Sequence, residues 1–351
     1  MKRAGGRQNF TKISIRHIRK FILYISVQFA VVCILMEIYG RLFDPFGISY
    51  YPEMSAYLDT MIIEEPIGYR NRPNLNGNYF GVPVTINSLG MRDREVSRND
   101  DGEFRILFMG DSLPFGVGVR YEDSLPYKLE EVLNSRRRGN PYFHYRTLNM
   151  GVISYNTEQE LIQLKQIGLL LKPRLAILVY SDNDIEPKMF IFNKRRKWYL
   201  NLGQRSYAVS LIYTLAENIS KRNSVLNSDD RAMNQYYAER WSVVDNSLHE
   251  INTLLRSKGV HFVLFTTEKR GIIFDLLRNA ANREGFPLVT LDYRQDLMKF
   301  RNSYIDAHPN KAGNEFLAEL IAEALEREGV LDHSGEVKDK NESAVIGNRD
   351  R

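Results

Sequence analysis

Short apolar runs alternate with longer amphipathic stretches over most of this chain. Five short runs are strand-like: residues 104–109, 144–149, 175–180, 260–266 and 287–291. The amphipathic stretches that separate and follow them show helical spacing, at about residues 125–137, 157–171, 241–258, 271–284 and 312–328. Continuous apolar strands between amphipathic helices are typical of a parallel sheet covered on both faces. The pattern therefore predicts an α/β domain, a three-layer sandwich around a central parallel sheet.

A different apolar pattern stands near the N-terminus. Residues 21–36 carry no charge, and with Ile38 and Tyr39 the stretch approaches the ~20 residues that a bilayer requires. Residues 1–20 hold seven Lys and Arg and no acid. A positive flank before the span predicts a cytoplasmic N-terminus and an exported body. We therefore expect a single-pass anchor at residues 21–39 in the inner (cytoplasmic) membrane, with the body periplasmic or extracellular.

Two alternatives to an anchor are a cleaved signal peptide and a buried core helix. A cleavage site requires small residues spaced like Ala-x-Ala after the apolar run, and Glu37-Ile-Tyr-Gly-Arg41 does not supply them. The only cysteine, Cys33, lies inside the apolar stretch. This excludes an intrachain disulfide and fits either compartment.

The basic arm also accounts for the charge of the chain. The formal net charge is +5 over 351 residues. Without the seven basic residues of the arm, 41 basic residues face 43 acidic ones, which is a net charge of −2. A nucleic-acid partner for the body therefore has no support.

The composition divides the chain into five segments. They are a basic cytoplasmic arm (1–20), the anchor (21–39), a neck rich in Pro, Gly, Asn and Tyr that packs on the main domain (40–100), the α/β domain (101–330) and a polar, disordered tail (331–351). Residues 185–240 interrupt the alternation as an insertion that contains Lys194-Arg-Arg-Lys-Trp-Tyr199. This insertion is either a cap that grips an anionic glycan or lipid headgroup through Arg and Trp, or a solvated loop.

The candidate chemistry begins at Gly110-Asp111-Ser112, where the first buried strand stops. A serine on a tight turn at a strand end presents both its hydroxyl and its backbone N–H, as nucleophilic catalysis requires. The alternative is an ordinary strand-to-helix turn with a capping serine. Gly151 and Asn183 also lie just past predicted strand ends, where ligands of parallel sheets bind.

A serine nucleophile needs a base and oxyanion donors. Of six histidines, His308 stands in a loop before the final helix, and Asp306 is placed either to orient its ring or to cap that helix. The backbone N–H groups of Ser112 and Gly151 and the amide of Asn183 are candidate oxyanion donors, although a plain turn and a turn-capping amide explain the last two equally well. No clustered ligand set or glycine fingerprint predicts a metal or another cofactor.

Four sequence blocks, taken in order, resemble the SGNH/GDSL hydrolase family. They are Gly110-Asp-Ser112, Leu148-Asn-Met-Gly151, Ile177-Leu-Val-Tyr-Ser-Asp-Asn183-Asp and Asp306-Ala-His308-Pro-Asn310. That family is named for a Ser, Gly, Asn and His in this chain order, here Ser112, Gly151, Asn183 and His308. The resemblance covers about residues 100–330 and implies a flavodoxin-like sheet and ester hydrolysis.

The neck adds a resemblance to one subgroup. Gly68-Tyr-Arg, Ile86-Asn-Ser-Leu-Gly-Met-Arg-Asp and Gly151-Val-Ile-Ser-Tyr-Asn look like bacterial membrane-anchored members associated with surface-polysaccharide production. Two positions depart from the family pattern. Ser181 stands where a glycine is usual, and the acid lies two residues before His308, with Ile305 at the usual position.

Together these features predict an exported, membrane-tethered serine esterase that forms an acyl-enzyme on Ser112, with His308 as base and Asp306 as acid. The resemblance implies an ester substrate with an O-acyl group, carried by an acylated glycan of a surface polysaccharide. Two alternatives stay open: an O-acyltransferase with the same site, and a non-catalytic subunit of an envelope polysaccharide assembly system.

Overall fold

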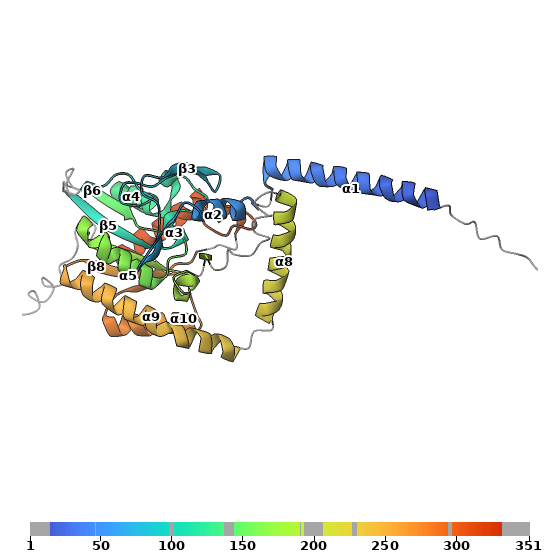
Figure 1. Cartoon of the computed structure of the whole chain (residues 1–351). Coiled ribbons are helices and arrows are strands. Elements are labelled where there is room, and N and C mark those ends of the chain that lie inside the picture. Colours follow the sequence, from blue (N-terminus) through green and yellow to red (C-terminus); the bar gives the residue numbers. More distant parts are fainter. Residues whose placement is uncertain are drawn as a thin grey trace, which may run out of the picture.

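The computed structural model describes residues 15–45, 47–97, 102–136, 144–189, 191–192, 206–226, 230–293 and 297–331. Its centre is a five-stranded sheet in the order β6-β5-β7-β8-β9 (Figure 1), and every neighbouring pair is parallel. The strands are β5 (Glu103–Gly110), β6 (His144–Asn149), β7 (Leu175–Tyr180), β8 (His261–Thr266) and β9 (Leu288–Thr290). Counted within the sheet this is the 2-1-3-4-5 order of flavodoxin-like folds, whose ligands bind where the strand order reverses.

Helices cover both faces of the sheet, which confirms the predicted three layers. One face carries α4 (Leu125–Arg136) and α11 (Lys311–Arg327), and the other carries α5 (Thr157–Gln166), α9 (Asp230–Ser257) and α10 (Ile272–Glu284). Successive side chains of β5 alternate between the two cores, as strand geometry requires. Leu107 and Met109 pack with α5 and α9, while Ile106 and Phe108 pack with α4 and α11.

The element boundaries follow the predicted ones closely, with one large exception. The bounds of β6 and β7 are as predicted, and the predicted helix 157–171 is α5 followed by the 3-10 turn η2 (Gly168–Leu171). Helix α9 begins at Asp230, well before the expected residue 241. Among the side chains described between residues 235 and 243 none is fully buried, and only Tyr237 and Trp241 pack on the core there, so the apolar stripe of α9 is weak in this part.

The sheet domain also contains the short helical elements α3 (Ser112–Phe115), η1 (Tyr121–Asp123), η3 (Asp182–Ile185) and η4 (Met298–Phe300). A longer helix, α8 (Tyr207–Leu226), precedes α9. Within the insertion predicted at 185–240, α8 and the first turns of α9 are helical, while Lys194–Tyr199 lies outside the described residues. Residues 1–14 of the arm and 332–351 of the tail also lie outside them.

The neck folds onto the sheet domain through a third apolar core. It contains α2 (Tyr50–Leu58) and two antiparallel hairpins, β1 (Ile62–Glu64) with β2 (Gly68–Arg70) and β3 (Asn76–Tyr79) with β4 (Val82–Thr85). Tyr57, Ile67 and Phe80 share this core with Phe115 and Tyr155. The neck therefore contacts the segments that directly follow β5 and β6.

Two buried charged residues of the neck hold these segments in place. The Arg92 guanidinium is fully buried and donates to the carbonyls of Phe115, Gly116 and Val119. The Asp93 carboxylate accepts from Arg146 at 2.6 Å and from the Asn149 N–H at 2.8 Å. The neck thus fixes the loop after α3 and the end of β6, between which the candidate site lies.

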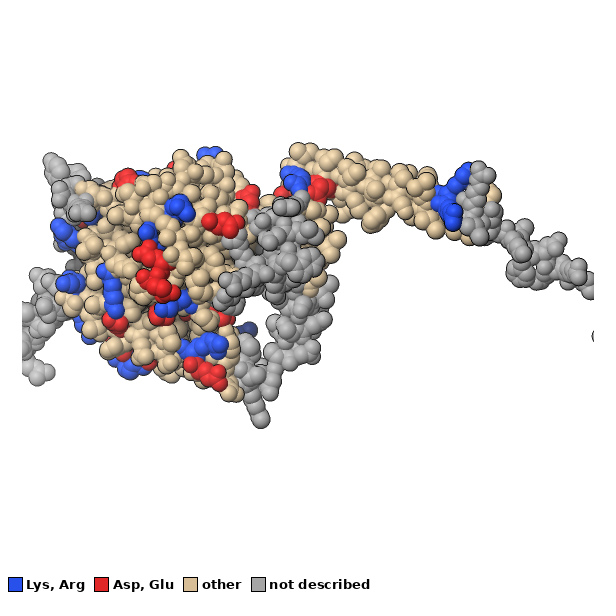
Figure 2. Space-filling view, viewed as in Figure 1, with Lys and Arg blue, Asp and Glu red and all other residues tan. Residues whose placement is uncertain are grey.

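Helix α1 (Ile15–Phe43) extends away from the body (Figure 1). Its residues 17–43 are long and apolar enough to cross a membrane, and the most apolar 18-residue window has a mean hydropathy of 2.3 with no residue buried. Figure 2 shows Lys and Arg near the two ends of this helix and a long uncharged surface between them. The helix is compatible with a single-pass anchor and equally with a signal sequence.

Candidate active site

Ser112 is the first residue of α3, directly after β5. Asp111 caps this short helix, and its carboxylate accepts the Leu113 N–H at 3.2 Å. The N–H groups of the first turn of a helix have no partner within that helix. Ser112 therefore presents its backbone N–H and its hydroxyl at the carboxyl end of the sheet, where β5 and β7 adjoin and the strand order reverses.

The structure brings Ser112, His308 and Asp306 into one hydrogen-bonded line. Ser112 Oγ lies 2.8 Å from His308 Nε2, and His308 Nδ1 lies 2.5 Å from Asp306 Oδ1. A proton on Nδ1, facing the carboxylate, leaves Nε2 free to accept from the serine hydroxyl. Asp306 is itself held in place, because Oδ1 also accepts the His308 N–H at 3.0 Å and Oδ2 accepts from Asn302 at 2.9 Å.

The electrostatics of this line favour a charged histidine. Burial of the ring opposes protonation, but the Asp306 carboxylate outweighs it and raises the pKa of His308 above its ordinary 6.5. Burial also opposes ionisation of Asp306, yet the bonds from His308 and Asn302 hold its pKa below the ordinary value. The pair is therefore arranged to stabilise an imidazolium beside a carboxylate.

Asp306 does not cap the final helix. The N-cap of α11 is Asn310, whose side chain accepts the Gly313 N–H at 3.0 Å. The loop before it is closed by a bond from the Asn302 N–H to the His308 carbonyl at 2.9 Å. The alternative of Asp306 as a helix cap is therefore wrong. Its carboxylate accepts hydrogen bonds from His308 and Asn302 instead.

Gly151 lies directly against α3. A side chain at this position would overlap the backbone nitrogen of Phe115, so only glycine allows the loop after β6 to pack on the helix that Ser112 begins. The Gly151 N–H donates to Asn149 Oδ1 at 3.0 Å. An oxyanion would therefore have to share this N–H with Asn149 or displace the Asn149 oxygen from it.

Asn183 stands in η3, just after β7. Its side chain is half-buried, and its amide donates to the Tyr155 carbonyl over 3.5 Å, the limit of a hydrogen bond. Such a long contact leaves the amide readily available to a better acceptor. Ser112, Gly151 and Asn183 thus lie just past the carboxyl ends of three neighbouring strands, β5, β6 and β7.

Ser181 connects two of these segments, a link that the sequence did not reveal. Its hydroxyl donates to the Asp111 carboxylate at 3.2 Å, and its backbone N–H donates to Asp184 at 3.1 Å. The loop that carries Asn183 is therefore tied to the residue before Ser112. The sequence feature that could have indicated this link is the serine itself, since it replaces the glycine usual at this position in the family that the sequence resembles.

Two further residues at the site were also missed. The Tyr50 ring, at the start of α2, lies 5.7 Å from the His308 ring between centroids. The Asn302 amide bridges Asp306 and the Val117 carbonyl, at 2.9 Å from each. Neither residue lies within the sequence blocks that contain Ser112 and His308, so those blocks could not identify it.

Three buried carboxyl groups lie behind the site. Burial raises the pKa of Asp111, Glu160 and Asp184, and the neighbouring carboxyls raise those of Glu160 and Asp184 further. Both Glu160 oxygens and Asp184 Oδ1 lack a hydrogen-bond partner among the described residues. Burial without a partner therefore favours the protonated forms of Glu160 and Asp184, because unpaired buried charges are costly.

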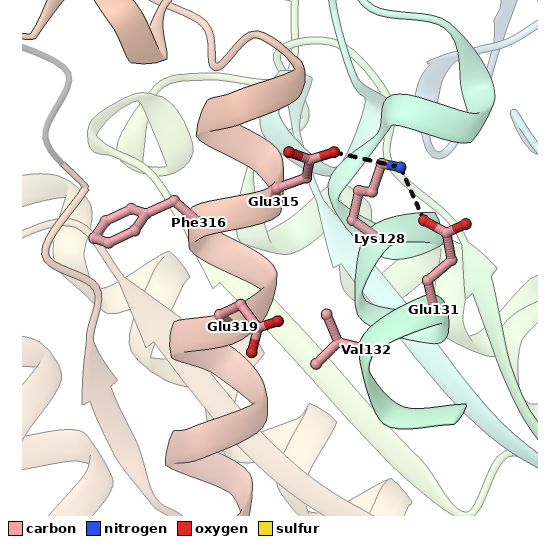
Figure 3. Close-up of a pocket in the computed structure, with 6 residues that line it drawn as sticks. All are labelled: Lys128, Glu131, Val132, Glu315, Phe316 and Glu319. Atoms are coloured by element: carbon pink, nitrogen blue, oxygen red, sulfur yellow. Dashed lines mark hydrogen bonds and ion pairs between the residues drawn. The ribbon is translucent and has the colours of Figure 1, made fainter. Parts of the chain in front are cut away.

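A cavity of about 380 Å³ lies elsewhere, between α4 and α11 (Figure 3). It is lined by Lys128, Glu131, Val132, Glu315, Phe316 and Glu319. Lys128 lies 2.8 Å from Glu131 and 3.7 Å from Glu315, so its ammonium is neutralised within the groove. None of the candidate catalytic residues lines this cavity.

Comparisons with known proteins give distant structural similarity alone. No family model and no curated protein matches the sequence. A crystal structure of TesA has a TM-score of 0.42 and 14% identity, and covers 64% of this chain and 98% of its own. The esterase EstA from Pseudoalteromonas sp. has a TM-score of 0.40, 12% identity and coverage of 64% and 98%. A lipase/acylhydrolase from Enterococcus faecalis has a TM-score of 0.37, 12% identity and coverage of 64% and 96%. Likeness at this level leaves function to be argued from the site.

Proposed function

We propose that this chain is a serine hydrolase of the SGNH type that cleaves ester bonds through an acyl-enzyme on Ser112. The observation that carries the proposal is the line of contacts from Ser112 Oγ to His308 Nε2 at 2.8 Å and from His308 Nδ1 to Asp306 at 2.5 Å. A nucleophile, a base and an orienting acid joined in this way are the parts of a serine triad.

The first half-reaction follows from the geometry. His308 Nε2 takes the hydroxyl proton as Ser112 Oγ bonds to the ester carbonyl carbon, and the carbonyl π pair moves to oxygen. The Ser112 N–H, the Gly151 N–H turned from Asn149 and the Asn183 amide donate to this oxyanion. The intermediate then collapses, the bond to the alcohol oxygen breaks, and His308 gives its proton to the leaving alcohol.

The second half-reaction reverses these roles. Water replaces the alcohol, His308 removes one of its protons, and the hydroxyl attacks the acyl-enzyme carbonyl. The bond to Ser112 Oγ breaks, the serine regains a proton from His308, and the carboxylic acid is released. An alcohol acceptor in place of water would make the same chain an O-acyltransferase, so the product of the second step distinguishes these two candidate activities.

Helix α1 supports a membrane-tethered form of this enzyme. The uncharged stretch at residues 21–36 and the seven basic residues before it support an N-terminus in the cytoplasm and an exported catalytic domain. The proposed substrate is an O-acyl group, and a surface polysaccharide as its carrier rests on the subgroup resemblance in the neck sequence. The contacts from Ser112 to His308 and from His308 to Asp306 argue against the non-catalytic alternative.

The test uses the full chain in detergent or nanodiscs with an activated short-chain ester. Ser112→Ala should lower kcat/KM by at least about 10³-fold without lowering the melting temperature, because the side chain is half-exposed and packs little. A fluorophosphonate probe should label the wild type at Ser112. Ser135→Ala, an exposed serine of α4, is the matched control and should keep full activity and labelling.

One result would overturn this assignment. If Ser112→Ala retained activity within about tenfold of the wild type, which corresponds to ~1.4 kcal/mol of barrier, another residue would be the nucleophile.

A further inference from the structure

In the part of α8 whose side chains are described, residues 207–216, the most exposed residues are apolar and the buried ones are polar. Ile212 and Leu215 are 68% and 53% exposed, and Ala216 beside them is exposed too. Ser210 and Thr214, four residues apart on the opposite face, are buried. A helix that faces water carries the reverse arrangement. The outward face of this first half of α8 is therefore suited to an apolar surrounding.

The start of α8 is attached to the end of α1. The Glu37 carboxylate of α1 accepts the Tyr207 N–H at 2.9 Å, the Ala208 N–H at 3.0 Å and the Ser206 hydroxyl at 2.9 Å. A carboxylate on the first N–H groups of a helix is a strong N-terminal cap. Gly40 packs so closely on the Tyr207 ring that a side chain there would overlap it.

This attachment defines the depth of α8 relative to the proposed membrane. Glu37 is the first charged residue after the uncharged stretch that begins at Phe21, so it marks the end of the apolar part of α1. Charged residues at the end of a span lie in the interfacial region. Figure 1 shows α8 running crosswise to α1, between α1 and the body. If α1 crosses the bilayer, α8 lies along the bilayer surface.

We propose that α8 is an interfacial helix that inserts Ile212 and Leu215 into the headgroup and acyl boundary of the membrane that α1 spans. The inference rests on the membrane anchor of the proposed function. It adds a second membrane contact to the first, and two contacts fix the orientation of the body where a single helix would let it rotate. Amphipathic helices bind at this depth through their apolar face.

The second contact holds the active site near the membrane. Only six residues separate Phe43, the last residue of α1, from Tyr50, and the Tyr50 ring packs on the His308 ring. That length of chain spans at most about 25 Å. The natural substrates of Ser112 are then esters of molecules attached to the membrane or emerging from it. A soluble activated ester can reach Ser112 whether or not the active site is held near the membrane.

The experiment uses the full chain with Cys33→Ser and single cysteines that carry a nitroxide, reconstituted in vesicles of phosphatidylethanolamine and phosphatidylglycerol. Ile212→Cys and Leu215→Cys are the test positions. Phe29→Cys in α1 and Ile63→Cys in β1, both exposed apolar positions at 69% and 58%, are the references for the bilayer interior and for water. Collision rates with oxygen and with a nickel chelate report depth, and turnover of a soluble ester reports folding.

The expected result is a nickel collision rate at residues 212 and 215 severalfold below that at residue 63, with oxygen collision between those of residues 63 and 29. A nickel collision rate at residue 212 equal to that at residue 63 would overturn the inference. So would protection from both reagents, because a protein surface would then cover the face. Water access at residue 29 would refute the anchor and this inference together, while loss of ester turnover in the unlabelled chain would refute the esterase alone.

Discussion

Asp306 determines what His308 can do. Its carboxylate contacts the ring nitrogen that faces away from Ser112 and also holds the backbone of the same residue. Asn302 fixes the other carboxylate oxygen, so the acid cannot rotate without losing a buried bond. The tautomer and the basicity of His308 therefore depend on one side chain two residues away.

Asp306→Asn is expected to reduce kcat by about 10⁴, as a wrong tautomer does in serine triads. The pH profile should change as well. His308 must be neutral to act as base, so activity rises as pH passes its raised pKa, and the acid limb of kcat/KM in the wild type lies above the ordinary 6.5. Loss of the carboxylate lowers that pKa, so the limb should move to lower pH. Unchanged rate and profile would leave a Ser112–His308 dyad.

Ser181 is expected to act as a positioning residue. Ser181→Ala removes the hydroxyl that joins the Asn183 loop to Asp111, and a shift of that loop worth ~1.4 kcal/mol in the transition state lowers kcat by about tenfold. KM for a small ester should change little, because Ser181 takes no direct part in the proposed mechanism. Ser181→Thr keeps the hydroxyl and should restore kcat. Equal kcat in all three forms would show that the link is only structural.

Helix α5 and the 3-10 turn η3 each hold a buried carboxyl group, Glu160 and Asp184, and the Glu160 charge raises the pKa of Asp184. The raised pKa of a buried acid means that the folded state holds its proton longer than the unfolded state. Such a group contributes stability below its unfolded pKa, and that contribution is lost as pH rises through the folded pKa. Part of the loss of stability at alkaline pH should therefore come from this contact between elements.

Glu160→Gln tests this account. The variant keeps the shape of the side chain but cannot ionise, so its melting temperature should exceed that of the wild type by a margin that grows as pH rises from 5 to 9. Glu158→Gln on the same helix, a half-exposed residue paired with Lys188, should follow the pH dependence of the wild type. A constant difference between Glu160→Gln and the wild type at all pH values would contradict the expected titration.

For the molecule as a whole, the distribution of charge around α1 sets the proposed orientation. The basic arm precedes the apolar stretch, and the catalytic domain follows it. An alkaline phosphatase fused after residue 60 should be active, and a reporter that fluoresces only in the cytoplasm should stay dark at the same position. The opposite pair of results would place the domain in the cytoplasm.

The elements of the sheet domain are readable from local sequence. Strand β7 is a continuous apolar run because both of its faces are buried, β5 and β8 are mostly apolar, and α4, α10 and α11 carry regular apolar stripes. Their bounds were therefore predicted to within a residue or so. Ser112 and His308 were also identified, because each stands in a short block of recognisable composition at the end of an element.

The remaining features depend on contacts between segments that are distant along the chain. From sequence alone, Asp306 could either orient His308 or cap the final helix. In the folded loop Asn310 is the cap, so only the contact with His308 is kept for Asp306. The Tyr50–His308 contact and the Ser181–Asp111 bond follow from the packing of the neck and from the order of the strands, neither of which periodicity encodes. The same holds for α8. Its composition shows apolar and polar residues, but which face is buried is set by the elements that pack against it.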